Sequence, residues 1–600
     1  MKKILSLLIG ICICTAISAQ NARLAQQYYQ NGEYAKAASM YKELYAQNER
    51  NNYYFDRYLN SLTSLEQYDE AEKAIKKQMR KYPDDLKMYV SYGNLLELQL
   101  KSKEAQEQYD KAIKKLPADK FFVTQLANAF LSLSKYDEAI SVYNKGGKLL
   151  NNKNAFSYNL AELYRRKGET ALMVQEYLNS LAANPARMQT IKTLLQRYLP
   201  ASRYDIAKQE LYARIQSQPN ATEYVELLSW MFIQEEDYKK ALRQVRALDR
   251  RLNENGSRVY NLGEIAFQAG DYDAAIDAYE YIIEKKGPVS SFYLDAKQKS
   301  LTAKRNQLVE GFSYSTEELK ALEQEYETFL NEFGRNKRSA NIILELAEFE
   351  AFYLNDIDKA IQLLAELIEY PNINRYTLAN GKIRLADFYL MQGEIWEATL
   401  LYSQVDKEFK EDVTGHKARY RNAKLSYYAK EFEWAQAQFD VLKASTSRLI
   451  SNDAIDMSVF IMDNLGLDTT AVPLELYADA ELLVFQNKFE EAFERMDLIS
   501  LRFPEHGLQD DLLYLKAQIY KKQNNYEAAK TVYETIIEKH TEEIRADNAL
   551  FELAELYETH LSDLEKAKSL YETLFIDFSG STFAVEARKR YRILRGDDIQ

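Results

Sequence analysis

The sequence GEYAKAASMY, residues 32–41, is the first copy of a pattern that recurs along the chain. It places one aromatic residue, Tyr34, three positions before a small residue, Ala37, and a second aromatic residue, Tyr41, four positions after it. The small residue returns at steps of 34, or of 68 across Met173, as Ala37, Ala71, Ala105, Ala139, Ala207, Ala241 and Ala275. A fixed period of this length is typical of a protein built from stacked copies of one small unit.

Each unit has the pattern of two short amphipathic helices joined by a tight turn, because apolar residues recur at steps of three and four. We expect the alanine where the second helix crosses the first, since a bulkier side chain there would push the helices apart. Tyrosine rings should fill the space between the helices and send their hydroxyls to water. A proline twelve residues beyond the alanine position ends the helix in four units, at Pro83, Pro117, Pro185 and Pro219. One helix pair cannot bury its apolar face alone, so neighbouring pairs must stack into a solenoid.

These residues resemble the tetratricopeptide repeat family, whose pattern has a small residue at the helix crossing, an aromatic residue on either side of it and a closing proline. In the first helix of the unit, Gly93 and Gly263 keep the small residue usual in the family, and other units use Ala25, Ala127 or Ala161. The resemblance implies an all-α fold, a right-handed superhelical solenoid of about 15 helix pairs.

The period lengthens in the second half of the chain. The equivalent positions there are separated by 38, 37, 57, 37 and 38 residues, and they are Ala360, Ala398, Ala435, Ala492, Ala529 and Ala567. These longer units resemble those of periplasmic and outer-membrane assembly tetratricopeptide proteins, including the lipoprotein of the β-barrel assembly machinery. The long step leaves room for an additional, unpaired helix capped by Ser451 or Asn452. That helix is interpreted either as a plug between two solenoid segments or as an element that docks a partner.

The spacings divide the chain into six expected segments. They are a signal peptide at 1–19, an N-terminal solenoid with the 34-residue period at 20–286, a longer-period segment with an inserted junction at 287–445, an unpaired helix and loop at 446–473, a C-terminal repeat segment at 474–581, and a capping helix and tail at 582–600.

The first 19 residues predict export across a membrane. Met1-Lys2-Lys3 gives a charged start, residues 4–17 form an apolar run too short to span a bilayer, and Ser18-Ala19 offers a cleavage site before Gln20, with a cut after Ser18 as the alternative. Lipid attachment at Cys12 or Cys14 is disfavoured, because an isoleucine precedes each where bacterial lipoproteins need a small residue. These are the two cysteines of the chain, so the mature protein is expected to form no disulfide. No apolar stretch of 18 residues follows residue 20, so we expect no transmembrane span in the mature chain.

Composition argues against several classes of function. With 78 basic and 90 acidic residues, the chain has a net charge of −12 and no basic surplus to neutralise phosphates, so no nucleic-acid partner is expected. The four histidines include no pair four residues apart that could place two metal ligands on one helix face. Gly146-Gly147-Lys148 lacks the first glycine of a phosphate-binding loop, and no nucleophile motif is present. We therefore predict no catalytic residue, no metal site and no cofactor.

Binding is expected instead on the inner wall, which the first helices of the units line in the tetratricopeptide family. Steps of 34 along one inner position give Gln26, Asn60, Asn94, Asn128, Glu162 and Gln196. A side-chain amide has both donors and an acceptor, so a ladder of asparagines can pair with a peptide backbone of any sequence. The alternative is that these are ordinary polar residues on a wet inner face. The carboxylate clamp known in the family is not supported, because its neighbouring slots hold Asp56, Val90 and Thr124. Inner-face aromatic residues that would suit a partner's anchor are Tyr53, Phe121, Tyr158, Trp230, Tyr260 and Phe267, although some of them could belong to the core.

The sequence thus predicts an exported, non-catalytic scaffold that mediates protein–protein interactions in the bacterial periplasm or at the outer membrane. Its partners would be proteins or peptides of the cell envelope. The alternative is a chaperone-like module that binds peptides or client proteins through the asparagine ladder. An enzyme ranks below both.

Overall fold

The structure of this protein is a computed structural model that describes residues 20–49, 51–310, 314–444, 447–465 and 470–597. The predicted signal peptide lies outside these ranges. Every regular element within them is a helix, which confirms the predicted all-α class. The chain divides into two compact units, which we call unit 1, up to Leu262, and unit 2, from Gly263 onward.

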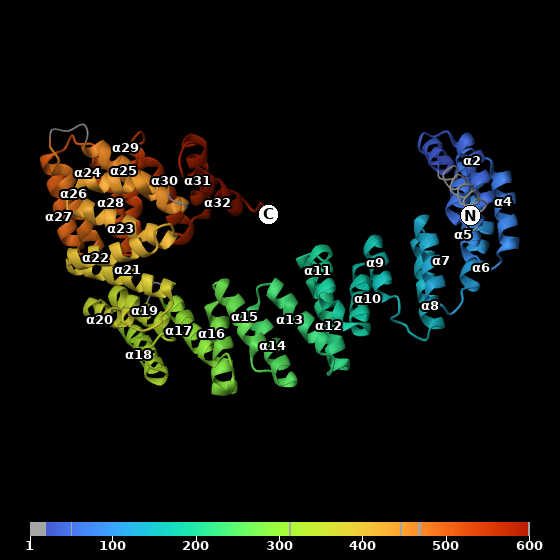
Figure 1. Ribbon diagram of the computed structural model, residues 1–600, viewed down its shortest axis with the longest axis horizontal. Coiled ribbons are helices and arrows are strands. Elements are labelled where there is room, and N and C mark those ends of the chain that lie inside the picture. Colours follow the sequence, from blue (N-terminus) through green and yellow to red (C-terminus); the bar gives the residue numbers. More distant parts are fainter. Residues whose placement is uncertain (1–19, 50, 311–313, 445–446, 466–469, 598–600) are drawn as a thin grey trace, which may run out of the picture. The chain divides into compact units, whose positions relative to one another are not determined.

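Unit 1 is a run of helices that alternate as the first and second members of successive pairs (Figure 1). A first helix at residues 20–30 precedes α2. The others are α2 (Tyr34–Gln47), α3 (Asn52–Ser64), α4 (Tyr68–Lys81), α5 (Leu86–Leu98), α6 (Ser102–Lys114), α7 (Lys120–Ser132), α8 (Tyr136–Leu149), α9 (Ser157–Lys167), α10 (Thr170–Ala183), α11 (Met188–Tyr198), α12 (Tyr204–Ser217), α13 (Thr222–Gln234) and α14 (Tyr238–Leu252). Helix α15 (Ser257–Gln268) crosses the division between the units.

Unit 2 continues the alternation with longer helices and one additional helix. Its helices are α16 (Tyr272–Tyr281), α17 (Tyr293–Glu310), α18 (Thr316–Phe333), α19 (Ala340–Phe349), α20 (Ile357–Ile368), α21 (Arg375–Gln392), α22 (Ile395–Glu408), α23 (Val413–Tyr428), α24 (Phe432–Leu442), α25 (Arg448–Leu465), α26 (Val472–Phe485), α27 (Phe489–Arg502), α28 (Gln509–Lys522), α29 (Tyr526–Lys539), α30 (Ala546–Thr559), α31 (Leu564–Asp577) and α32 (Ala584–Arg595). Taken two at a time, with α25 and α32 left over, the described helices make fifteen pairs, in agreement with the predicted number.

The alanine positions explain why the pairs can form. All thirteen alanines identified from the two periods are buried, with at most 1% of their surface exposed. Two positions of the pattern have no alanine: Met173 in the 34-residue period, and Leu322, which lies 47 residues after Ala275. Both side chains are also buried. The predicted close crossing of the two helices is therefore confirmed at these positions of the described chain.

The buried tyrosines depart from one expectation. Their rings do fill the space between helices, but several hydroxyls bond to carboxylates instead of reaching water. The Tyr279 hydroxyl donates to Glu264 at 2.5 Å, the Tyr571 hydroxyl donates to Glu558 at 2.7 Å, and the Tyr177 hydroxyl donates to Glu162. A hydroxyl at the end of a buried ring needs a partner within the fold, and an acidic side chain on the first helix supplies it.

Helix α25 is the additional helix of unit 2. It begins at Arg448, so Ser451 and Asn452 lie inside it and do not cap it as expected. The Ser451 hydroxyl donates to the Lys443 carbonyl at 2.6 Å and ties the start of α25 to the end of α24. Farther along, the Phe460 ring lies 5.2 Å from the ring of Tyr477 in α26. The helix therefore packs on neighbours that precede it and follow it in the chain.

A buried carboxyl group follows α19. Glu350 opens a short π-helical turn, Glu350–Leu354, and its side chain is buried. The Lys359 ammonium lies 2.6 Å from Glu350 and also pairs with Glu323. Burial raises the pKa of Glu350 from its usual 4.5 to about 7.

This raised pKa predicts a pH-dependent stability. Because the folded chain keeps the Glu350 proton up to about pH 7, the stabilisation is complete below about pH 4.5 and is lost as the pH rises through 7. We expect Glu350→Gln to flatten the fall in unfolding free energy between about pH 5 and 8, measured by chemical denaturation. Glu369→Gln, an exposed change directly after α20, is the control, and identical pH curves for Glu350→Gln and wild type would contradict the assignment.

The helix crossing predicts a second effect. A Cβ atom added at Gly93 in α5 would lie 2.2 Å from Cε1 of Tyr109 in α6, and that ring is fully buried. We expect Gly93→Ala to lower the free energy of unfolding by about 1–3 kcal/mol through overpacking, despite the better helix propensity of alanine. Gly507→Ala, which meets no atom within 4 Å, should leave thermal and chemical denaturation almost unchanged. Equal effects of the two changes would rule out the steric explanation.

Candidate functional site

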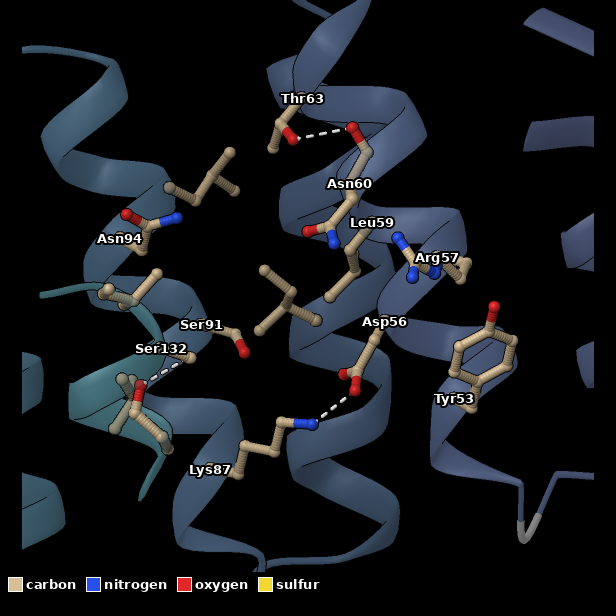
Figure 2. Close-up of a pocket in the computed structure, with 15 residues that line it drawn as sticks. Tyr53, Asp56, Arg57, Leu59, Asn60, Thr63, Lys87, Ser91, Asn94 and Ser132 are labelled. Carbon is tan, nitrogen blue, oxygen red and sulfur yellow. Dashed lines mark hydrogen bonds and ion pairs between the residues drawn. The ribbon is translucent and has the colours of Figure 1, made fainter. Parts of the chain in front are cut away.

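The predicted asparagine ladder lies on three successive first helices of unit 1. Asn60 is in α3, Asn94 in α5 and Asn128 in α7, because the 34-residue period returns the chain to the same position of each pair. Asn60 and Asn94 line one hollow of about 340 Å³, which we call the amide hollow. Figure 2 shows the two side chains pointing toward one another from neighbouring helices. Asn128 does not line the hollow, where α7 contributes Ala129, Ser132 and Leu133.

The amides of these asparagines are available to a ligand. Among the described residues, no hydrogen bond reaches the side chain of Asn60, Asn94 or Asn128. The same ladder position in α9 differs, because Glu162 accepts the Tyr177 hydroxyl and pairs with Arg165 at 3.0 Å. Gln26 in the helix at 20–30 and Gln196 in α11 likewise have no hydrogen-bond partner among the described residues, so Glu162 in α9 is the ladder residue that is engaged within the fold.

Charged residues at the edge of the amide hollow are paired with each other or with rings. The Lys87 ammonium forms an ion pair with Asp56 from the neighbouring first helix, as Figure 2 shows. The Arg57 guanidinium lies 4.7 Å from the centre of the Tyr29 ring and 5.1 Å from that of Tyr53. Asp56 thus offsets the charge of a lysine that could otherwise hold a peptide carboxylate. The sequence alone did not reveal this pair, because only the fold brings residues 31 apart into contact.

Uncharged groups line the rest of the amide hollow. Thr63 donates its hydroxyl to the Asn60 carbonyl at 3.0 Å, and Ser132 donates to the Ala129 carbonyl at 2.8 Å. Leu59, Val90 and Leu95 give the hollow an apolar floor. An apolar surface with a few polar groups that both donate and accept suits an uncharged, extended segment of polypeptide.

Of the predicted aromatic anchors, Tyr53 lines the amide hollow, and three others lie elsewhere in unit 1. Tyr158 is in α9, Trp230 in α13 and Tyr260 in α15; all three are half-buried and none lines the amide hollow. The Tyr158 ring packs 6.4 Å from that of Tyr177 and lies beneath the Arg187 guanidinium, 5.1 Å away. The structure therefore does not bring these aromatic residues together with the asparagines, and their part in binding stays a prediction.

The first helices of unit 2 present paired charged residues where those of unit 1 present amides. Arg384 in α21 pairs with Glu348 of α19 at 2.6 Å and with Asp387 at 3.3 Å. Asp387 also pairs with Arg421 of α23 at 3.3 Å and accepts the Tyr402 hydroxyl at 2.5 Å. These charges therefore satisfy one another across α19, α21 and α23.

The described residues form neither a metal centre nor a membrane-spanning helix. Within the residues that the structure describes, no three His, Cys, Asp or Glu side chains are placed to hold a metal ion. No helix in the same ranges is long and apolar enough to cross a membrane. The predicted lack of catalytic residues and of a cofactor stays a prediction.

Comparison with solved structures finds helical-repeat proteins at low similarity. The complex described as Naa15/Naa10 bound to HypK-THB is 14% identical, with 96% of this chain and 94% of that chain covered and a TM-score of 0.26. A tetratricopeptide repeat protein from Parabacteroides merdae is 14% identical over 47% of this chain and 91% of its own, with a TM-score of 0.27. The TPR domain of P58(IPK) is 14% identical over 75% of this chain and 99% of its own, with a TM-score of 0.24. No curated protein sequence matches the chain.

Two stretches of the sequence match family models. Residues 227–290 match one model described as tetratricopeptide repeat, and residues 510–538 match another with the same description. The first stretch covers α14 and α16 with the helices beside them, and the second covers most of α28 and α29. The same helix pairs, with the same buried alanine, continue along the described chain, and together with the two matches they support a tetratricopeptide repeat protein.

Proposed function

We propose that this protein is an exported, non-catalytic scaffold that holds protein partners in the bacterial periplasm or at the outer membrane. Tetratricopeptide repeats support a role in protein–protein interaction. We propose further that unit 1 binds an extended segment of a partner along α3, α5 and α7. The observation that carries this proposal is the pair of free amides, Asn60 and Asn94, that face one hollow.

The chemistry of a carboxamide explains why such a wall suits a peptide. An extended segment exposes backbone N–H and C=O groups in alternation, and one asparagine side chain can both donate to and accept from them. Backbone contacts of this kind do not depend on the sequence of the segment. The apolar floor of the amide hollow adds contact area without demanding a charge.

Export is the second part of the proposal. It is supported by the charged start, short apolar run and small residues at the end of residues 1–19, together with the lack of cysteines after Cys14. A protein that folds after export without disulfides must be stabilised by packing, and the regular burial of alanine and tyrosine is consistent with that demand.

The alternative is a chaperone-like module that uses the same asparagines for unrelated clients. It is favoured by the same observation, because backbone recognition tolerates many sequences. The two functions differ in what the wall holds in cells. A scaffold retains one partner in fixed proportion, and a chaperone binds a spread of unfolded segments.

The amide hollow predicts the effect of removing its asparagines. We expect Asn60→Ala combined with Asn94→Ala to leave the fold intact and to weaken a bound segment about tenfold, since two hydrogen bonds of about 0.5–1.5 kcal/mol each are lost. The segment is identified first by photocrosslinking in cells from a photoreactive residue placed at position 94. Its affinity is then measured by calorimetry with the purified full chain.

Gln189→Ala is the matched control, because it removes an exposed amide from α11 on the same wall, outside the amide hollow. One stoichiometric envelope partner would support the scaffold, and many unfolded clients would support the chaperone. A failure to crosslink at position 94, or equal affinities for the double variant and wild type, would overturn the binding site.

The export proposal makes a separate prediction. The intact mass of the protein isolated from its native cells should correspond to a chain that begins at Gln20, or at Ala19 if the alternative cut is used. Replacing Ala19 by a bulky residue should retain the full-length precursor, because signal peptidases need a small side chain there. A mature protein that still starts at Met1 would contradict export by this route.

A further inference from the structure

Unit 1 has a second hollow of about 650 Å³, which we call the aromatic pocket. Its lining comes from the ends of α2 and α4, the starts of α3 and α5, and the first turns of α7. At the starts of α3 and α5, residues close in sequence line the two hollows: Asn52 and Asp85 line the aromatic pocket, and Tyr53 and Lys87 line the amide hollow. A segment bound in the amide hollow therefore lies close to the aromatic pocket.

Three aromatic rings of this pocket are open to solvent. Phe121 is 68% exposed, Phe122 is 37% exposed and Tyr82 is 36% exposed. The two phenylalanine rings meet edge to face, with their centres 5.6 Å apart and their planes at 81°. Backbone N–H groups of Phe121 and Phe122 donate to the Asp119 carboxylate, which caps α7 and fixes both residues at its start. The rings are thus held in place without being covered.

Three other exposed rings of unit 1 have a cation against them. Arg57 lies over Tyr53, Arg165 lies over Tyr198, and Lys81 lies over Tyr82 in the aromatic pocket itself. In the described part of the chain the exposed ring of Tyr212 has none, but it lies outside the pocket. Among the described residues, no cation lies over Phe121 or Phe122. The ring faces that are not used in the edge-to-face contact are consequently free to receive one, and such a contact is favourable when the cation is partly desolvated.

The charges that line the aromatic pocket favour the same kind of ligand. Glu49, Asp84 and Asp85 contribute three carboxylates, against one ammonium from Lys81. Lys81 pairs with Glu49, and Asp85 accepts the Lys87 backbone N–H at 3.1 Å. Asp84 is exposed and has no ion-pair or hydrogen-bond partner among the described residues. A negative charge without a partner next to free ring faces is complementary to a positively charged side chain.

We propose that the aromatic pocket holds a lysine or arginine side chain of the segment bound at the amide hollow. The cation would lie on the faces of Phe121 and Phe122, with Asp84 as its counter-ion. The inference rests on the proposed peptide-binding function and adds a preference to it, because backbone contacts at Asn60 and Asn94 select no side chain. An acidic side chain in this place would meet like charge and be disfavoured.

The test compares short synthetic peptides that share an uncharged background and differ at one position, which holds Arg, Lys, Gln, Leu or Glu. Their affinity for the purified full chain is measured by fluorescence anisotropy at physiological ionic strength. We expect the Arg and Lys peptides to bind about fivefold more tightly than the Gln peptide, and the Glu peptide to bind most weakly. Phe121→Ala and Asp84→Asn should each reduce this preference to less than about twofold.

Two matched variants serve as controls. Tyr212→Ala removes an exposed ring of α12, and Asp69→Asn removes an exposed carboxylate of α4, and neither residue lines the two hollows. Both should keep the full preference for Arg and Lys. Melting curves followed by circular dichroism verify that each variant folds.

The outcomes separate this inference from the function on which it rests. Equal binding of the Arg and Gln peptides, or tightest binding of the Leu peptide, would overturn the cation pocket. A preference for Arg that survives in both Phe121→Ala and Asp84→Asn would overturn it too, since attraction by net charge alone would explain the result. In each of these cases Asn60→Ala combined with Asn94→Ala would still weaken the binding of all peptides, and the proposed peptide-binding function would stand. If no peptide binds the wild-type chain, both proposals fail.

Discussion

The structure depends on the close approach of two helices at a small residue. Each alanine of the repeat is buried against a neighbouring helix, and the glycine of α5 lies so near the Tyr109 ring that one added carbon would overlap it. The small residues let the two helices approach closely, and the rings of neighbouring tyrosines such as Tyr109 then fill the space between them at the density of a protein interior. The small residue and the ring that packs on it belong to the same helix pair, so the pair can be repeated along the chain. Neighbouring pairs then bury the apolar faces that a single pair leaves exposed.

The same geometry decides which polar residues are free to bind. The large residue of the second helix is often a tyrosine, and its hydroxyl reaches the first helix. Where the inner-wall residue there is acidic, as at Glu162, the tyrosine holds it. In α4 the large residue is Ile75, which cannot bond to Asn60, and the Tyr109 hydroxyl of α6 does not reach Asn94, so both amides face the hollow (Figure 2). One position of the repeat thus serves stability in some pairs and is open to a ligand in others.

The two units use their first helices in different ways. In unit 2, Arg384, Asp387 and Arg421 form a chain of ion pairs from one first helix to the next, which joins neighbouring pairs. In unit 1, the helices α3, α5 and α7 have uncharged amides in the corresponding region, and the Asp56–Lys87 pair lies at its edge. Groups that satisfy one another contribute to the fold, and groups without partners are the ones that can recognise another molecule.

The sequence alone determined the all-α class, the number of helix pairs, the buried alanines and the placement of Asn60, Asn94 and Asn128 on successive first helices. It could do so because a local period fixes which face each residue occupies. Only the tertiary structure decided that Asn60 and Asn94 share a hollow that Asn128 does not line, and that Tyr158, Trp230 and Tyr260 lie apart from it. It also decided that Asp56 meets Lys87, that tyrosine hydroxyls turn to carboxylates, and that Phe121 stays open beside Asp84. These outcomes depend on how neighbouring helix pairs are offset and on which rotamer each side chain adopts. The repeat period specifies neither the offset nor the rotamers.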